Sequence, residues 1–276
     1  MVATPIGNLG DLTARAVELL RTCDRVVAED TRRTRQLLTH LGITGKPLDR
    51  LDAHATDADC ARVAAQLAAG QRVALVTDAG TPGVSDPGER LVEAAIAAGI
   101  GVVPIPGASA VLAALVASGL AGDGRFRFLG FLPRDGVDRR AAIALVSDTP
   151  ETVVLFEAAN RTAATLRELA DATPGRGACV ARELTKRHEE LVRGTCASLA
   201  QGQREWIGEV VLVLGPHEPG AREATVDDAA VDARIDEALG RGDHARTVAE
   251  RLAAWSGRPR REIYERVIMR KAGRAR

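Results

Sequence analysis

Short apolar runs alternate with longer amphipathic segments through most of the chain, and this alternation constrains the fold more than any other feature. The runs at 25–28 and 72–77 are rich in valine and bounded by polar residues, as buried strands are. Helical patterns follow at 31–42 and 89–99, and each ends in a glycine. Strand and helix in alternation are typical of a parallel sheet covered by helices. The sequence therefore predicts an α/β protein.

The order of these runs predicts two α/β domains and a small C-terminal all-helical domain. The first domain, residues 1–122, adds a strand at 101–105 and an apolar helix at 108–118 to a mostly parallel sheet. The second domain spans residues 123–217, and the helical domain spans residues 226–276. At about 150 residues per domain, a chain of 276 residues has room for this division.

The second domain is expected to hold a mixed sheet. Its helix is expected at 162–172, but the segment 178–199 offers two strands with little room for a helix between them. Closely spaced strands pair antiparallel, because a parallel crossover needs a dozen residues or more. The expected strands lie at 125–129, 152–156, 178–181, 190–193 and 209–214.

Composition excludes several classes of protein. Lys and Arg (37) balance Asp and Glu (37), which argues against a disordered chain and a uniformly basic nucleic-acid binder. Aromatic residues are only 3% of the chain, so RNA binding on stacked aromatic platforms is not expected. No apolar run reaches the roughly 18–20 residues of a membrane span, and no secretory signal is evident.

The cysteines and histidines indicate neither disulfides nor a metal site. The four cysteines form no C-x-x-C pair and the five histidines show no ligand spacing, so no metal is predicted. These features favour a reducing, cytoplasmic setting and no association with a membrane.

Balanced overall charge hides a basic C-terminal segment. Residues 241–276 hold 11 Lys and Arg against 4 Asp and Glu, a net charge of +7, so the first 240 residues carry −7. Two interpretations stay open: a solvated helical surface, or a module that binds a polyanion.

Three loops that contain glycine follow expected strands and are the best candidates for a binding site. They lie at 2–11, 77–88 and 105–110, and the second holds three glycines and two prolines. Glycine lets the backbone approach a ligand closely, and ligands of α/β sheets bind beyond the carboxyl ends of the strands. The third loop opens a helix, whose N-terminus favours anionic groups. The sequence contains no P-loop, and the glycines at 240 and 242 follow no strand, so neither nucleotide motif is assigned.

The motifs resemble, in order along the chain, those of the ribosomal RNA small subunit methyltransferase I family within the tetrapyrrole methylase superfamily. The matching segments are ATPIGNLGDLT, AEDTRRTRQLL, VTDAGTPGVSDPG, PIPGASA, LGFLPR, LFEA and RELTKRHEE. The resemblance runs from Val2 to about Gly215, and the basic segment is similar to the family's C-terminal helical domain.

This resemblance implies an enzyme that uses S-adenosyl-L-methionine bound between two α/β domains. It implies 2′-O-methylation of a decoding-centre cytidine in 16S rRNA, with 16S rRNA or the small ribosomal subunit as partner, and a homodimer. Carried over by position, the cofactor-binding residues are Pro5, Asp78, Ala79, Gly80, Thr81, Val84, Ser109, Ala110, Glu157 and Leu184. The chain departs from the family's pattern at Glu157-Ala-Ala-Asn-Arg161, where relatives often have proline and histidine before the arginine.

Methyl transfer to a ribose hydroxyl benefits from a general base, for which Glu29, Asp30 and Lys186 are candidates; a lysine could also stabilise a developing alkoxide. For Glu29 and Asp30, capping of the following helix is an equal alternative. Arg32, Arg33 and Arg35 are expected to contact RNA phosphates, unless they form a solvated helix face. Two other functions remain open: a precorrin-type tetrapyrrole C-methylase, and a non-catalytic RNA-docking protein.

Overall fold

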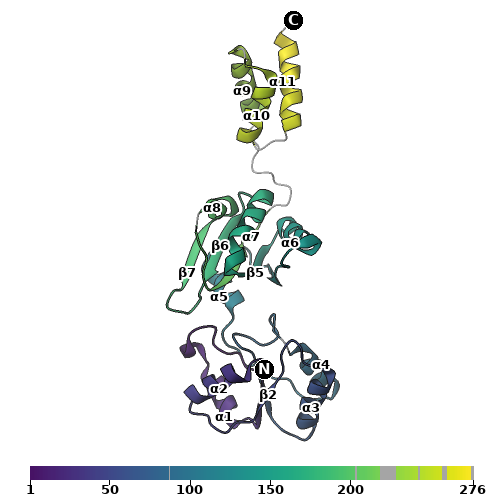
Figure 1. Cartoon of the computed structure of the whole chain (residues 1–276), viewed down its shortest axis with the longest axis vertical. Helices are drawn as coiled ribbons and strands as arrows, with labels where there is room; N and C mark the ends of the chain where they lie inside the picture. The colour runs from purple at the N-terminus through teal and green to yellow at the C-terminus, as the bar shows by residue number, and fades with distance from the viewer. Residues whose placement is uncertain (87, 203, 218–227, 242, 257–259, 275–276) are drawn as a thin grey trace. The chain divides into compact units, whose positions relative to one another are not determined.

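The computed structural model describes the chain apart from residues 87, 203, 218–227, 242, 257–259 and 275–276 (Figure 1). Its internal contacts divide the chain into two units, Met1–Pro219 and Gly220–Arg276.

A parallel sheet lies at the centre of the first half of unit Met1–Pro219. Its strands run in the order β2 (Leu48–Arg50), β1 (Arg25–Ala28) and β3 (Val73–Val76). Alternate residues of β1 face opposite sides, as strand geometry requires. Val26 and Ala28 pack in one apolar cluster with α1 and α2, whereas Val27 packs in another with α3 and α4. The helices are α1 (Ala14–Thr22), α2 (Thr31–His40), α3 (Asp57–Ala68) and α4 (Glu89–Ala97) (Figure 1).

The strand expected at 101–105 is not a regular strand in the structure. Only a single parallel bridge, between Val2 and Ile105, forms there. A ladder needs several consecutive bridges, whereas here the Ile105 amide donates to the Met1 carbonyl at 2.8 Å and the Met1 amino group donates to the Val103 carbonyl at 3.1 Å. The expectation of a five-residue strand was therefore wrong, and this segment meets residues 1–4 only through isolated hydrogen bonds.

The second half of this unit is built on a five-stranded mixed sheet in the order β4-β5-β8-β6-β7. Only β4 and β5 pair parallel, and the other neighbours are antiparallel. The expected mixed sheet and the α/β class are thus confirmed. The strands are β4 (Phe126–Phe131), β5 (Thr152–Ala158), β6 (Gly177–Arg182), β7 (Glu190–Thr195) and β8 (Glu209–Leu214).

Helices cover both faces of the mixed sheet. On one face α5 (Ala110–Ser118) buries Val111 and Leu115 against β5, β6 and β8. On the other face α7 (Ala159–Ala172) buries Leu166 and Leu169. This second face also carries α6 (Gly136–Asp148) and α8 (Cys196–Gln201). Because α5 also continues from the third glycine loop, it ties that loop to the second sheet.

The described residues of unit Gly220–Arg276 form three helices, α9 (Asp228–Gly240), α10 (Ala245–Ser256) and α11 (Arg260–Arg274). Ile263 and Val267 are fully buried between them, as the sequence indicates. Tyr264 and Ile268, which were also expected in this core, are 38% and 41% exposed, since the 3.6-residue period turns them away from α9 and α10. The expected break at 256–259 lies largely outside the described residues, and so does the side chain of Trp255, the remaining expected core residue.

Candidate functional site

The three glycine loops are tied together by hydrogen bonds. Thr4 and Gly80 exchange backbone hydrogen bonds of 2.8 and 3.0 Å, which join the first loop to the second. The Thr81 hydroxyl donates to the Ala108 carbonyl at 3.0 Å and joins the second loop to the third. Loops held in this way form a preorganised surface at the carboxyl end of the first sheet.

Gly80 shows why the second loop needs glycine. Its φ is +84°, a left-handed conformation that residues with a side chain rarely adopt. A Cβ built there would lie 3.3 Å from Ile6 Cγ2 in the first loop. The backbone of this loop therefore lies close to its neighbour because residue 80 has no side chain.

A cavity of about 300 Å³ opens between these loops and the second sheet. Its volume is at the lower end of the range typical of small-molecule sites, about 300–1,000 Å³. Apolar side chains such as Phe131, Phe156 and Val211 supply one wall, and the glycine loops supply the other. Among the residues that the sequence assigned to the cofactor, the cavity brings together Ala79, Gly80, Thr81, Val84, Ser109, Ala110 and Glu157.

The other three assigned residues lie beside this cavity rather than in its wall. Pro5 and Asp78 line an adjoining cavity of about 270 Å³ together with Arg33 and His40. Leu184 is buried in the apolar cluster that contains Ile6 and Val111. Its position supports the first and third loops from behind.

Glu157 is a fully buried carboxylate with all of its charge compensated. Its Oε1 lies 2.5 Å from Arg161 and accepts from the Ala158 amide at 2.8 Å, while Oε2 accepts from the Thr165 hydroxyl at 2.6 Å. Arg139 lies 3.8 Å away and also donates to Thr165. Side-chain oxygens held so fully inside the second sheet leave little capacity for a ligand, so Glu157 shapes the wall rather than offering a free acceptor.

Acidic groups gather where β1 and β3 end. Glu29 accepts from the Thr77 hydroxyl at 3.1 Å, and the Asp78 carboxylate accepts from the Asp30 amide at 3.0 Å. Asp86, which the sequence did not assign to the site, lines the 300 Å³ cavity. Burial raises the pKa of Asp86 from 3.8 to about 6; a hydrogen bond from Thr77 opposes this, and the charges of Glu29 and Asp78 add to it.

Asp30 acts as a helix cap in the structure. Its carboxylate accepts from the Arg32 amide at 2.8 Å and from the Arg32 guanidinium at 2.9 and 3.2 Å. The hydrogen bonds from the Arg32 side chain and backbone hold the pKa of Asp30 well below its ordinary value. A carboxylate so strongly ionised is a poor proton acceptor, which favours capping among the alternatives for this residue.

Lys186 lies on a strained loop against the first glycine loop. Glu183 and Thr185 have φ angles of +50° and +65°, and a Cβ on Gly7 would meet Lys186 Cγ at 2.4 Å. The ammonium group pairs with Glu183 at 2.9 Å and Glu209 at 3.2 Å. Burial acts to lower the pKa of Lys186, but hydrogen bonds to these two carboxylates outweigh it and raise the pKa. Lys186 is thus a fixed positive charge beside a cavity that Glu209 lines.

The three arginines of α2 differ in their partners. Arg32 pairs with Asp30, Arg33 lies 3.5 Å from Asp78, and all three guanidinium-bearing residues, including Arg35, are exposed. Arg33 alone of the three lines the 270 Å³ cavity. The structure thus places one arginine beside the loops and the others on the outer surface of α2.

No cluster of three or more His, Cys, Asp or Glu side chains suited to a metal ion occurs among the residues that the structure describes. All four cysteines are buried and free. Within the described part of the chain, no helix is both long and apolar enough to span a membrane.

Solved structures define the class of this fold. The methyltransferase CobJ superposes with a TM-score of 0.58 at 21% identity, over 78% of this chain and 92% of that chain. Diphthine synthase superposes with a TM-score of 0.58 at 17% identity, over 78% and 90%. The family model described as tetrapyrrole (corrin/porphyrin) methylases matches residues 1–200. The two sheets of unit Met1–Pro219, with the loop-lined cavity, thus have the tetrapyrrole methylase fold.

Relatives of known sequence narrow the class. The chain is 44% identical over 270 residues to ribosomal RNA small subunit methyltransferase I of Xylella fastidiosa, covering 96% of each chain. The protein of the same name from a Synechocystis species is 42% identical over 96% of this chain and 95% of its own. That of Halalkalibacterium halodurans is 38% identical over 96% and 92%. The chain belongs to the ribosomal RNA small subunit methyltransferase I family, and it is a methyltransferase that depends on S-adenosylmethionine.

Proposed function

We propose that this chain methylates the ribose 2′-hydroxyl of a decoding-centre cytidine in 16S rRNA, as rRNA or within the small subunit. The observation that carries the proposal is the loop-lined cavity in a chain similar, over 96% of its length, to proteins named for small-subunit rRNA methylation.

The residues of the cavity suit S-adenosylmethionine. Gly80 brings a backbone without a side chain to the cavity wall, where its own N–H and C=O are bonded to Thr4, and Phe131 and Phe156 offer aromatic surface. The bound cofactor supplies an electrophilic methyl group. The walls hold it in one orientation, and positioning of two reactants can lower a barrier by about 7–11 kcal/mol.

Among the acidic residues, Asp86 is best placed to accept the proton of the ribose hydroxyl. It lies in the wall of the cavity, and a carboxyl group with a pKa of about 6 is ionised at neutral pH yet basic enough to take a proton. The Thr77 hydroxyl, which contacts Asp86, also donates to Glu29 at 3.1 Å, so Glu29 helps to hold the Thr77 side chain in place. Lys186 and Asp30, whose pKa values move away from neutrality, are assigned electrostatic and capping roles.

RNA phosphates are proposed to meet Arg32, Arg33 and Arg35. The helical unit contributes less charge than its sequence suggests, because Arg266 and Arg270 pair with Asp232, Asp228 and Asp236 of α9. The domain limits 1–122, 123–217 and 226–276 and a cytoplasmic setting remain parts of the proposal. A homodimer is proposed too, supported by Leu112 and Val116 of α5, which are 52% and 75% exposed one helical turn apart.

Purified protein incubated with labelled S-adenosylmethionine tests the substrate. Small ribosomal subunits, naked 16S rRNA and a precorrin-type tetrapyrrole are offered separately. Label on a cytidine 2′-oxygen supports the proposal. Label on the tetrapyrrole points to the C-methylase alternative, and label on neither substrate points to a docking protein.

Gly80→Val tests the cofactor part of the proposal. A β-branched side chain at φ +84° strains the loop by about 1–3 kcal/mol and closes the approach to the cavity. Calorimetry is expected to show loss of S-adenosylmethionine binding while circular dichroism remains that of the parent. Gly45→Val, at φ +69° with open space around it, is the matched control and should bind normally.

A further inference from the structure

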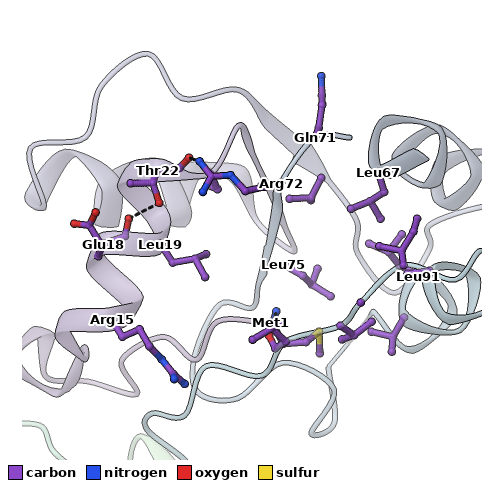
Figure 2. A pocket seen from close by; sticks show the side chains of 18 residues that line it. Met1, Arg15, Glu18, Leu19, Thr22, Leu67, Gln71, Arg72, Leu75 and Leu91 are labelled. Atoms are coloured by element: carbon purple, nitrogen blue, oxygen red, sulfur yellow. Dashed lines mark hydrogen bonds between the residues drawn. The ribbon is translucent and has the colours of Figure 1, made fainter. Parts of the chain in front are cut away.

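A cavity of about 490 Å³ lies between α1 and the layer of α3 and α4, and no residue of the three glycine loops lines it. Figure 2 shows Leu19 on one side of this cavity and Leu67 and Leu91 on the other. The Arg72 guanidinium, also in this view, donates to the Thr22 carbonyl of the cavity's own wall. The walls are thus mostly apolar, and the site of a polar ligand is better sought beside the glycine loops.

The 270 Å³ cavity beside the first two glycine loops has the mixed lining that a nucleobase needs. Leu9 and Leu37 supply apolar surface, and Leu9 is 46% exposed although its side chain is large and apolar. Arg33, Gln36 and His40 line the same cavity, three and four residues apart on one face of α2. Single-stranded bases are recognised by contacts to their faces and by hydrogen bonds to their edges. This cavity offers both kinds of contact.

Asp78 gives this cavity an acceptor with spare capacity. Its Oδ1 accepts from the Asp30 amide at 3.0 Å, and its Oδ2 lies 3.5 Å from the Arg33 guanidinium. A carboxylate has about four acceptor positions, so some remain for a ligand. The N4 amino group of cytosine is a donor to carboxylates, whereas uracil carries a carbonyl oxygen at that position. A carboxylate here therefore favours cytosine over uracil.

Thr77 connects this cavity to the one assigned to the cofactor. It lines the 270 Å³ cavity, and its hydroxyl forms a hydrogen bond with Asp86, which lines the 300 Å³ cavity. Burial is the main cause of the raised pKa of Asp86, and the charge of Asp78 adds to it, as expected for two carboxylates at short range. A base bound at Asp78 thus has its ribose within reach of the proposed proton acceptor.

We propose, in extension of the ribose methylation proposed above, that the 270 Å³ cavity binds the base of the target nucleotide and that Asp78 selects cytosine by accepting from its N4 amino group. Leu9 and Leu37 contact the faces of the base. The Gln36 amide donates to the O2 and N3 edge, which carries acceptors in cytosine. Because this assignment rests on the proposed function, one of the two measurements below needs no methyl transfer.

The first measurement compares the binding of five-nucleotide RNAs that carry cytidine or uridine at the centre. Fluorescence anisotropy follows each RNA with the full chain saturated with S-adenosylhomocysteine. The parent is expected to favour cytidine by about 10-fold or more. Asp78→Asn should remove this preference, because an amide both donates and accepts and so pairs with either base. Asp123→Asn, the same change at a 61% exposed position outside the cavity, should keep it.

The second measurement is single-turnover methylation of small ribosomal subunits that carry cytidine or uridine at the target position. In Asp78→Asn the ratio of the two rates should fall by about 10-fold or more. An effect of Asp78 on the ionisation of Asp86 alone would change both rates equally and leave the ratio as in the parent. The ratio thus separates selection of the base from a role in the chemical step.

Gln36→Glu is a second variant with little risk to folding, because Gln36 is exposed on α2. A carboxylate facing O2 and N3 should weaken binding of the cytidine RNA about 10-fold, whereas Gln201→Glu at the exposed end of α8 should not. The proposal is overturned if the parent binds both RNAs equally, if Asp78→Asn keeps the parental preference, or if the two glutamine variants bind alike. If neither subunit is methylated but the preference in binding is present and depends on Asp78, the base site stands and only the proposed reaction fails.

Discussion

Asp86 and Glu157 line the same cavity, but the structure holds their charges in opposite ways. Glu157 is fully buried and meets Arg161, Arg139 and the Thr165 hydroxyl. Asp86 is half buried, and its charged neighbours are the carboxylates Glu29 and Asp78. The second sheet thus neutralises the charge of Glu157, whereas the loops of the first sheet leave the charge of Asp86 without a nearby positive partner among the described residues. A compensated carboxylate stabilises a wall, and an uncompensated one is available for proton transfer.

Asp86→Asn should give the largest effect. If Asp86 accepts the ribose proton, its loss lowers the single-turnover rate by about 10²- to 10⁴-fold, the usual contribution of a general base. Cofactor affinity should change little. In the parent the rate should rise with pH through about 6, the pKa of Asp86, and this dependence should be absent in the variant. Glu89→Gln, at the exposed start of α4, is the control. A variant with the parental rate and pH profile would refute the role.

Glu157→Gln should act on stability rather than on chemistry. Removing its charge leaves Arg139 and Arg161 facing a neutral group in a buried site, which costs about 3–5 kcal/mol for a broken buried pair. Glu168→Gln is a close control, because Glu168 also binds Arg139, at 3.0 Å, but is 42% exposed. Urea unfolding should show a change below about 1 kcal/mol for Glu168→Gln. Equal losses of stability in the two variants would show that the buried ion pairs of Glu157 matter no more than the exposed pair of Glu168.

Much of the fold was accessible from the sequence. β1 and β8 have the expected limits, since valine-rich runs there are flanked by charged residues or glycine. α3 and α6 were not placed individually. The capping box of Thr56 and Asp59 is a sequence signal for the first of them. The strand expected at 101–105 failed for a non-local reason, because its pairing depends on residues about 100 positions away.

The site was foreseen only in its loops. Glycine and proline mark backbone turns locally, so the loops could be located from the sequence, and Gly80 and Ser109 were assigned by carrying over positions from the family resemblance. Phe131, Phe156 and Glu209 come from β4, β5 and β8, and only tertiary structure brings them to the same cavity. The ionisation of Asp86 likewise depends on burial and on the charge of Glu29, which follows β1, and no local pattern in residues 77–88 reveals either.

The difference in stability between Asp86→Asn and the parent should depend on pH, because only the parent has the Asp86 carboxyl group. The folded protein raises the pKa of Asp86 from 3.8 to about 6, so folding favours the protonated form. The resulting stabilisation is fully present below pH 3.8 and is lost as pH rises through 6. Asp86→Asn should therefore gain stability relative to the parent between pH 4 and pH 7, by about 1 kcal/mol once the half-exposed position is considered. Chemical unfolding at the two pH values measures it, and a relative loss at pH 7 would show that Asp86 is compensated after all.

Lys186→Met probes the boundary between the two regions and should have the smallest effect on stability. Lys186 pairs with Glu183 and Glu209 near the cavity, but its side chain is 28% exposed and Glu209 is 73% exposed. Such pairs contribute about 0–1 kcal/mol, so the variant should unfold within about 1 kcal/mol of the parent. Its catalytic rate separates two roles: a fixed charge that stabilises an alkoxide lowers the rate without moving the pH midpoint, whereas a proton acceptor would move it. Because Glu183 and Glu209 raise the pKa of Lys186, we expect the midpoint near pH 6 to stay with Asp86. A shifted midpoint in Lys186→Met would show that Lys186 influences the ionisation of Asp86, and this would contradict the independence of the two regions.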